Sequence, residues 1–68
     1  MITEIGIMAG DIWHYLDNHG KSSLNDLVRE IGKERDLALM SVGWLAREGY
    51  VIVEGSSPNY SVSLRKQG

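Results

Sequence analysis

The chain has 68 residues, with seven basic and nine acidic side chains and no cysteine. This length allows one domain, and so small a core is only marginally stable unless something reinforces it. The absence of cysteine excludes disulfides and thiol redox chemistry, and a net charge of −2 argues against a protein held to phosphates by its overall field. Association with a second copy is the reinforcement that this composition leaves open.

No apolar run approaches the roughly 18 residues that a membrane helix requires, and the run Tyr50–Val53 is only as long as a strand. The start of the chain, Met1-Ile2-Thr3-Glu4, has neither the basic residues nor the apolar stretch of a signal peptide. We therefore expect a cytoplasmic protein that makes no membrane contact.

Between Thr3 and Asn18, apolar residues recur three and four positions apart, as they do along one face of a helix. They are Ile5, Met8, Ala9, Ile12, Tyr15 and Leu16. Gly20 follows where a left-handed residue commonly ends a helix. The pattern predicts a first helix over residues 3–18.

Two glycines inside this first helix, Gly6 and Gly10, each cost about 1 kcal/mol relative to Ala. Their spacing is that of closely packed helix pairs, and they lie beside Trp13 at the edge of the apolar face. The bare backbone could admit a segment of the same chain or of a second copy.

A second helix of about two turns is predicted after Ser22 and Ser23, because a hydroxyl cap followed three residues later by an acid, Asp26, is typical of a helix start. Gly32 ends it. The third helix is predicted from Arg35 to Glu48, without proline, and is closed by Gly49.

Beyond Gly49 the spacing of the apolar residues changes from that of a helix to that of a strand. Tyr50–Val53 predicts a strand, Gly55–Asn59 a loop, and Tyr60–Leu64 a second strand with alternating apolar and polar residues. Together they predict a hairpin. We expect one domain over residues 1–64 and a loose polar tail over residues 65–68.

Three helices followed by a hairpin, with a helix-turn-helix in the middle, is the order of the winged helix fold. Over Ser22–Val53, the type and spacing of several residues resemble those of winged-helix regulators. These residues are Leu24, Leu27, Val28 and Ile31-Gly32, then Leu45 and Gly49-Tyr50-Val51. A second resemblance is to a narrower group, the small stand-alone winged helix-turn-helix proteins of bacteria and archaea grouped as a domain of unknown function. The residues that carry it are Ala9-Gly10-x-Ile12-Trp13 and Gly43–Gly49. The resemblance implies an α+β fold and a homodimer, and it brings no assigned substrate or operator.

The third helix has apolar residues on two sides at about 100° per residue. The side that the winged-helix register makes the core side holds Ala38, Val42 and Leu45. Leu37, Met40 and Trp44 cluster nearly opposite. Because a bare apolar patch is unusual on a soluble monomer, we predict that these three, with Trp13, form a dimer or partner interface. The alternative is that Leu37 and Trp44 fold back under the wing or against the second helix as ordinary core.

In DNA-reading relatives the third helix enters the major groove. Here the acids Glu34 and Asp36 stand where a phosphate would meet the helix dipole, and residues 55–59 of the expected wing tip contain no lysine or arginine. The candidate nucleic-acid contacts are Lys33, Arg35, Arg47 and Ser56. We expect duplex DNA to be bound weakly at most.

His14 and His19, the two histidines, are five residues apart on the first helix and point in different directions, so they cannot share a metal unaided. The serines fit helix capping and loops better than nucleophilic roles. We predict a non-enzymatic binding module, with no catalytic residues, metal, cofactor or small-molecule substrate. Its function is either protein contact through an adapted recognition helix or transcription-regulator-like DNA binding, and the fold alone does not decide between them.

Overall fold

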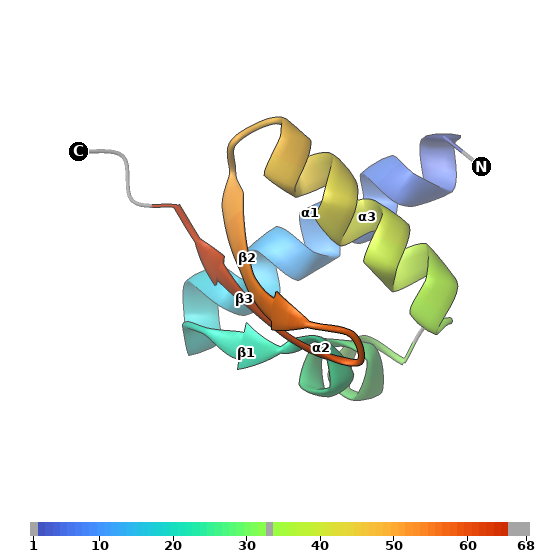
Figure 1. Cartoon of the computed structure of the whole chain (residues 1–68). Coiled ribbons are helices and arrows are strands. Elements are labelled where there is room, and N and C mark those ends of the chain that lie inside the picture. Colours follow the sequence, from blue (N-terminus) through green and yellow to red (C-terminus); the bar gives the residue numbers. More distant parts are fainter. Residues whose placement is uncertain (1, 33, 66–68) are drawn as a thin grey trace.

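A computed structural model describes residues 2–32 and 34–65. Three helices are followed by a hairpin, and a short strand lies between the first two helices (Figure 1). The elements are α1 (Ile2–His19), β1 (Ser22–Ser23), α2 (Leu24–Ile31), α3 (Arg35–Arg47), β2 (Val51–Ser56) and β3 (Asn59–Leu64). This arrangement confirms the predicted α+β winged helix.

The first helix is one residue longer at each end than predicted. It ends where Gly20, at φ 79°, donates its N–H to the carbonyl of Leu16 at 2.8 Å. A left-handed glycine at this point satisfies a carbonyl that the helix itself leaves free, and it turns the chain toward β1.

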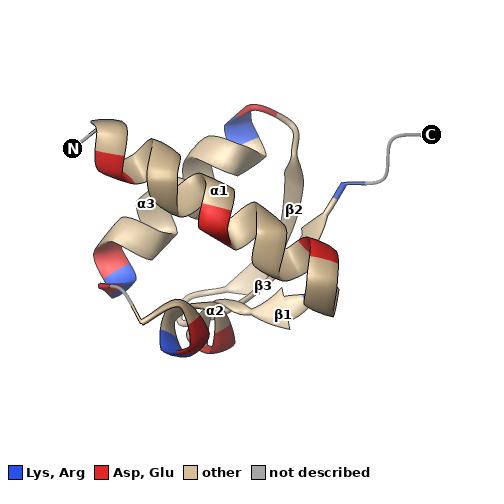
Figure 2. Ribbon diagram, turned by 180° about the vertical axis from the view of Figure 1, so that it is seen from behind, with Lys and Arg blue, Asp and Glu red and all other residues tan. Residues whose placement is uncertain are grey.

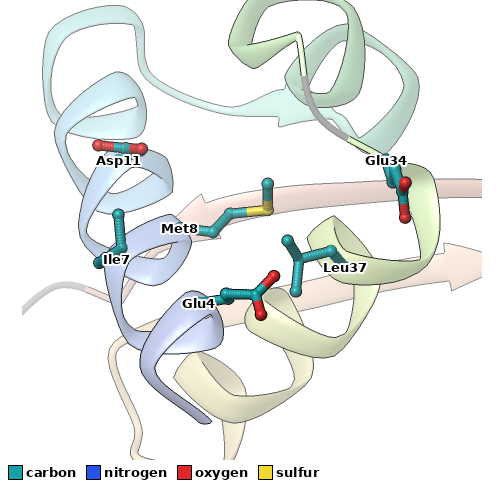
Figure 3. A pocket seen from close by; sticks show the side chains of 6 residues that line it. All are labelled: Glu4, Ile7, Met8, Asp11, Glu34 and Leu37. Atoms are coloured by element: carbon teal, nitrogen blue, oxygen red, sulfur yellow. The ribbon is translucent and has the colours of Figure 1, made fainter. Parts of the chain in front are cut away.

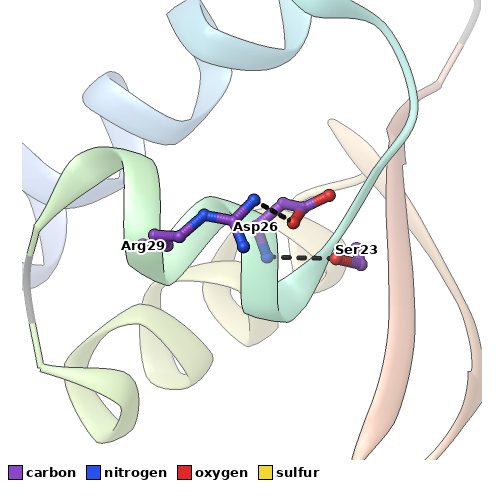
Figure 4. Close-up of polar contacts among 3 residues, drawn as sticks. All are labelled: Ser23, Asp26 and Arg29. Carbon is purple, nitrogen blue, oxygen red and sulfur yellow. Dashed lines mark hydrogen bonds and ion pairs between the residues drawn. The ribbon is translucent and has the colours of Figure 1, made fainter.

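The start of α2 is fixed by the predicted cap (Figure 4). The hydroxyl oxygen of Ser23 accepts the backbone N–H of Asp26 at 3.0 Å, and Arg29 donates to Asp26 Oδ1 at 2.6 Å one turn further on. The cap satisfies one of the N–H groups that have no partner within the helix. Gly32, at φ 72°, ends α2 as predicted.

At the end of α3 the chain turns directly into the wing. Gly49, at φ 81°, donates to Ala46 O at 3.1 Å, and Tyr50 N–H donates to Leu45 O at 2.9 Å. This pair of bonds is the Schellman arrangement, which closes the last turn and sets the direction of the next strand.

The three strands form one antiparallel sheet in the order β1-β3-β2. The predicted loop over residues 55–59 was too long, because β2 continues to Ser56 and β3 begins at Asn59. Gly55 makes this tight reversal possible. It lies at φ 92°, and a Cβ added there would stand 2.5 Å from the carbonyl oxygen of Asn59.

Strand β1 was not predicted at all. Ser22 pairs with Val62, and Ser23 pairs with Ser61. Two serines carry no alternating pattern, and their pairing depends on a strand about forty residues away, so no local signal announces it. Ser23 therefore serves both as a strand residue and as the cap of α2.

The core lies between α1, α2, α3 and the inner face of the sheet, as the arrangement in Figure 1 indicates. Its buried apolar members are Met8, Ala9, Ile12, Leu16, Leu24, Leu27, Ala38, Val42, Leu45, Val51 and Val62. The predicted core side of the third helix is confirmed. The buried Ser41 is satisfied within α3, since its hydroxyl donates to Leu37 O at 2.8 Å.

The expected loose tail is described only at its first residue. The backbone N–H of Arg65 donates to Tyr50 O at 2.9 Å, which ties this residue to the start of the wing. Residues 66–68 lie outside the described part of the chain, so for them looseness stays a prediction.

Candidate interaction surface

The outward face of α3 is mainly apolar. Its exposed positions are Asp36, Leu39, Met40, Gly43, Trp44 and Arg47. One acid and one base thus accompany three large apolar side chains on the face that a winged helix normally presents to a partner. Sequence analysis missed Leu39, which is 41% exposed, because it had been assigned to neither apolar stripe.

The three residues of the predicted apolar stripe on α3 differ in their exposure to solvent. Met40 and Trp44 are 43% and 47% exposed, whereas Leu37 is half-buried and packs against the core. Trp44 does not belong to the buried core cluster, so it has not folded back as ordinary core. Leu37 has less surface left to offer a partner than the sequence pattern suggested.

Trp44 and Trp13 come together in one surface hollow, which we call the aromatic hollow. It lies between α1 and the end of α3 and has a volume of about 260 Å³. Its lining residues are Gly6, Ala9, Gly10, Trp13, Trp44, Leu45 and Tyr50. The predicted interface residues Trp13 and Trp44 therefore line one hollow, although they lie 31 positions apart in the sequence.

Tyr50 was missed as a member of this hollow. The sequence places it in a β-branched run, which favours a strand, and nothing in that run indicates that Tyr50 would line a hollow together with residues of α1. It precedes β2 and is 46% exposed. The position directly after a closing glycine is the signal that could have separated it from the strand.

The two glycines of α1 form an open part of the hollow. A Cβ added at Gly6 or Gly10 would meet no atom within 4 Å, and both residues are exposed. The sequence left open a close contact within the same chain, and the described residues make none there. Within the described part of the chain, neither glycine is therefore required to avoid a steric clash.

A second hollow, which we call the acidic hollow, lies between α1 and the start of α3 (Figure 3). It has a volume of about 350 Å³ and is lined by Glu4, Ile7, Met8, Asp11, Glu34 and Leu37. Its lining thus combines three acidic residues, Glu4, Asp11 and Glu34, with three apolar ones. Within residues 2–32 and 34–65, no group of three His, Asp or Glu side chains is arranged to hold a metal ion.

The candidate nucleic-acid contacts do not form one patch. Arg35 donates to Pro58 O at 3.2 Å, which ties the start of α3 to the wing tip. Arg47 lies at the other end of the helix, about 18 Å away at 1.5 Å per residue. Ser56 is exposed on β2, and Lys33 lies outside the described residues.

Basic and acidic side chains alternate over this part of the molecule, as Figure 2 shows for the ends of α3. Glu34 and Asp36 flank Arg35, and Glu48 follows Arg47. The two described cations of α3, Arg35 and Arg47, therefore each have an acid beside them in the sequence. Such pairs are typical of a solvated surface rather than of a phosphate site.

Both histidines are exposed on α1 and contact neighbouring rings. His19 stacks on Tyr15 with ring centroids 4.3 Å apart, and the rings of His14 and Trp13 are perpendicular with centroids 5.5 Å apart. They occupy different faces, as their spacing predicted.

Among the helices of the described residues, none is long and apolar enough to cross a membrane.

The three helices, the helix-turn-helix of α2 and α3, and the β2–β3 wing define a winged helix-turn-helix domain. The chain belongs to the family described as "Winged helix-turn-helix domain (DUF2582)", whose model matches residues 1–64. A relative of the same length class is the uncharacterized protein MJ1608 of Methanocaldococcus jannaschii. It is 31% identical over 64 residues, which cover 91% of each chain.

Two solved structures have the same fold. The solution structure of protein BT2368 from Bacteroides thetaiotaomicron has a TM-score of 0.78 at 29% identity, and the match covers 91% of this chain and 76% of that one. The Zα domain of PKZ from Carassius auratus, solved in complex with Z-DNA, has a TM-score of 0.79 at 23% identity, over 90% of this chain and 97% of that one. The likeness to the Zα domain concerns the fold alone.

Proposed function

We propose that this chain is a non-enzymatic, cytoplasmic binding module of the transcription-regulator type, which pairs with a second copy and whose recognition helix is adapted to protein contact. The observation that carries the proposal is the outward face of α3, where Leu39, Met40 and Trp44 stand exposed. Relatives that read DNA place polar and basic side chains on this face.

The energy available on this face supports a protein partner. Fully burying a large apolar side chain is worth roughly 1.5–3 kcal/mol, and about half of that remains to be gained where the side chain is already half covered. Met40 and Trp44 together with Trp13 can thus supply a few kcal/mol before the cost of association is subtracted. This amount matters for a domain whose whole stability is small.

Duplex DNA is the second candidate partner, and the Zα domain in complex with Z-DNA is the observation that favours it. Lys33, Arg35, Arg47 and Ser56 would make the contacts. The electrostatics weigh against tight binding, because Glu34 and Asp36 bring negative charge to the end of α3 that would otherwise attract a phosphate.

Sedimentation equilibrium at several protein concentrations, with and without a mixed-sequence duplex and at two salt concentrations, tests the proposal. We expect a mass that rises toward that of a dimer with concentration, and DNA binding that is weak and lost at the higher salt. A constant monomer mass at hundreds of micromolar would contradict self-association. Nanomolar, sequence-specific binding in physiological salt would make DNA the principal partner.

A further inference from the structure

We infer that the aromatic hollow receives a second copy of this chain, which packs its own α1 and Trp13 against it across a two-fold axis. This inference rests on the self-association proposed above and specifies the surface that performs it. Three properties of the hollow support this occupant: its shape, its lack of charge and its exposed area.

The hollow has the shape that a symmetric contact requires. In a two-fold dimer the same patch meets itself, so it must hold both a projection and a recess. Trp13 and Trp44 are exposed and can project, whereas the bare backbone at Gly6 and Gly10 leaves open space beside them. A ring of one copy can thus enter the space that the glycines of the other copy leave.

Charge separates the aromatic hollow from the acidic one. No residue that lines the aromatic hollow carries a charge, so two copies meet there without like-charge repulsion. The acidic hollow, in contrast, has Glu4, Asp11 and Glu34 among its lining residues. A second copy would therefore meet fewer charged groups at the aromatic hollow than at the acidic one.

The exposed aromatic rings supply part of the contact area. Trp13, Trp44 and Tyr50 are 36%, 47% and 46% exposed. Since an aromatic side chain carries about 150–250 Å², these rings offer roughly 200–300 Å² per copy, against the approximately 800 Å² per partner of a standard interface. The rings alone thus cover about a quarter to a third of a standard interface, so further surface of α1 and α3 must join the contact, and we expect a weak dimer.

Glycine substitutions test this assignment in the full chain. A Cβ meets nothing within 4 Å at Gly6 or Gly10, so Ala at each position should raise the melting temperature of the monomer. Both glycines line the hollow, whereas Asn25 is exposed on α2, away from it. We expect G6A/G10A to raise the dimer dissociation constant at least tenfold, while the control N25A, which also places Ala on a helix surface, leaves it within about twofold.

Tryptophan emission gives a second readout that needs no substitution. The chain has two tryptophans, and both line the hollow. On dilution, their emission should shift to longer wavelength over the same concentration range in which the sedimentation mass halves, because dissociation returns both rings to water.

The outcomes separate the inference from the proposed function. If the wild type dimerises but G6A/G10A has an unchanged dissociation constant, or if the mass halves without an emission shift, the aromatic hollow is not the contact and the proposed self-association stands. If the wild type stays monomeric at hundreds of micromolar, both are overturned. A weakened G6A/G10A dimer with an intact N25A dimer, together with the emission shift, supports the inference.

Discussion

Trp13 of α1 and Trp44 of α3 line the same surface hollow, and each leaves more than a third of its side chain in contact with solvent. Two partly exposed tryptophans in one surface hollow of so small a domain are unusual unless a partner covers them. The surface proposed to bind a second copy is therefore formed by α1 and α3 together, rather than by α3 alone.

Replacing Trp44 with Ala should dissociate the dimer and leave a folded monomer. The ring is about half exposed, so the monomer should lose only about 1–2 kcal/mol of its free energy of unfolding. Leu24→Ala is the control for a core position, because Leu24 is fully buried and its loss should cost roughly 2–5 kcal/mol. Circular dichroism and sedimentation measure the two effects separately. A Trp44→Ala protein that stays dimeric and merely melts earlier would place this residue outside the interface.

Removing the acids at the start of α3 should strengthen DNA binding. Glu34→Asn with Asp36→Ser takes away the two carboxylates that flank Arg35 and leaves the cation in place. Fluorescence anisotropy with a labelled duplex should then show higher affinity and a steeper dependence on salt, because more phosphate contacts release more counterions. An unchanged affinity would mean that the recognition helix does not face DNA in the complex.

The cap of α2 gives a prediction for stability. Ser23→Ala removes the acceptor of the Asp26 N–H, bonded at 3.0 Å, and should lower the free energy of unfolding by about 1 kcal/mol. Ser23→Asp, which keeps an acceptor at the cap, should lose much less. Urea denaturation checks both variants. Equal losses would indicate that the pairing of Ser23 with Ser61 in the sheet matters more than the cap.

The wing turn should tolerate no side chain at Gly55. A methyl group there would stand 2.5 Å from Asn59 O, in addition to the strain of a positive φ, so Gly55→Ala should cost clearly more than the approximately 1–2 kcal/mol of that strain alone. Gly20→Ala is the matched control, because Gly20 also has a positive φ but open space around it. Thermal unfolding of the two variants should differ. Similar melting temperatures would mean that the hairpin relaxes around the added methyl.

The helices could be predicted from the sequence because their signals are local. Ser23, Gly32 and Gly49 mark ends by backbone conformations and caps that only a few residue types favour. The wing was predicted too short and β1 was missed, because strand pairing joins residues far apart in the chain. No pattern within Ser22–Ser23 indicates a partner at Val62.

The candidate surface was predicted only in part for a similar reason. Helical angles correctly separated Ala38, Val42 and Leu45 from the outward residues. They could not show that the contact with α1 half-covers Leu37 while leaving Trp44 open, since this depends on how the two helices cross. The meeting of Trp13, Trp44 and Tyr50 is likewise a result of packing.

An isotope-filtered NOE experiment on a mixture of labelled and unlabelled chains tests most directly whether the aromatic hollow joins two copies. At a concentration where sedimentation shows a dimer, we predict intermolecular contacts from the indole protons of Trp13 in one copy to the α protons of Gly6 and Gly10 in the other. Intermolecular contacts confined to α2 or the wing, with none at these glycines, would contradict the account.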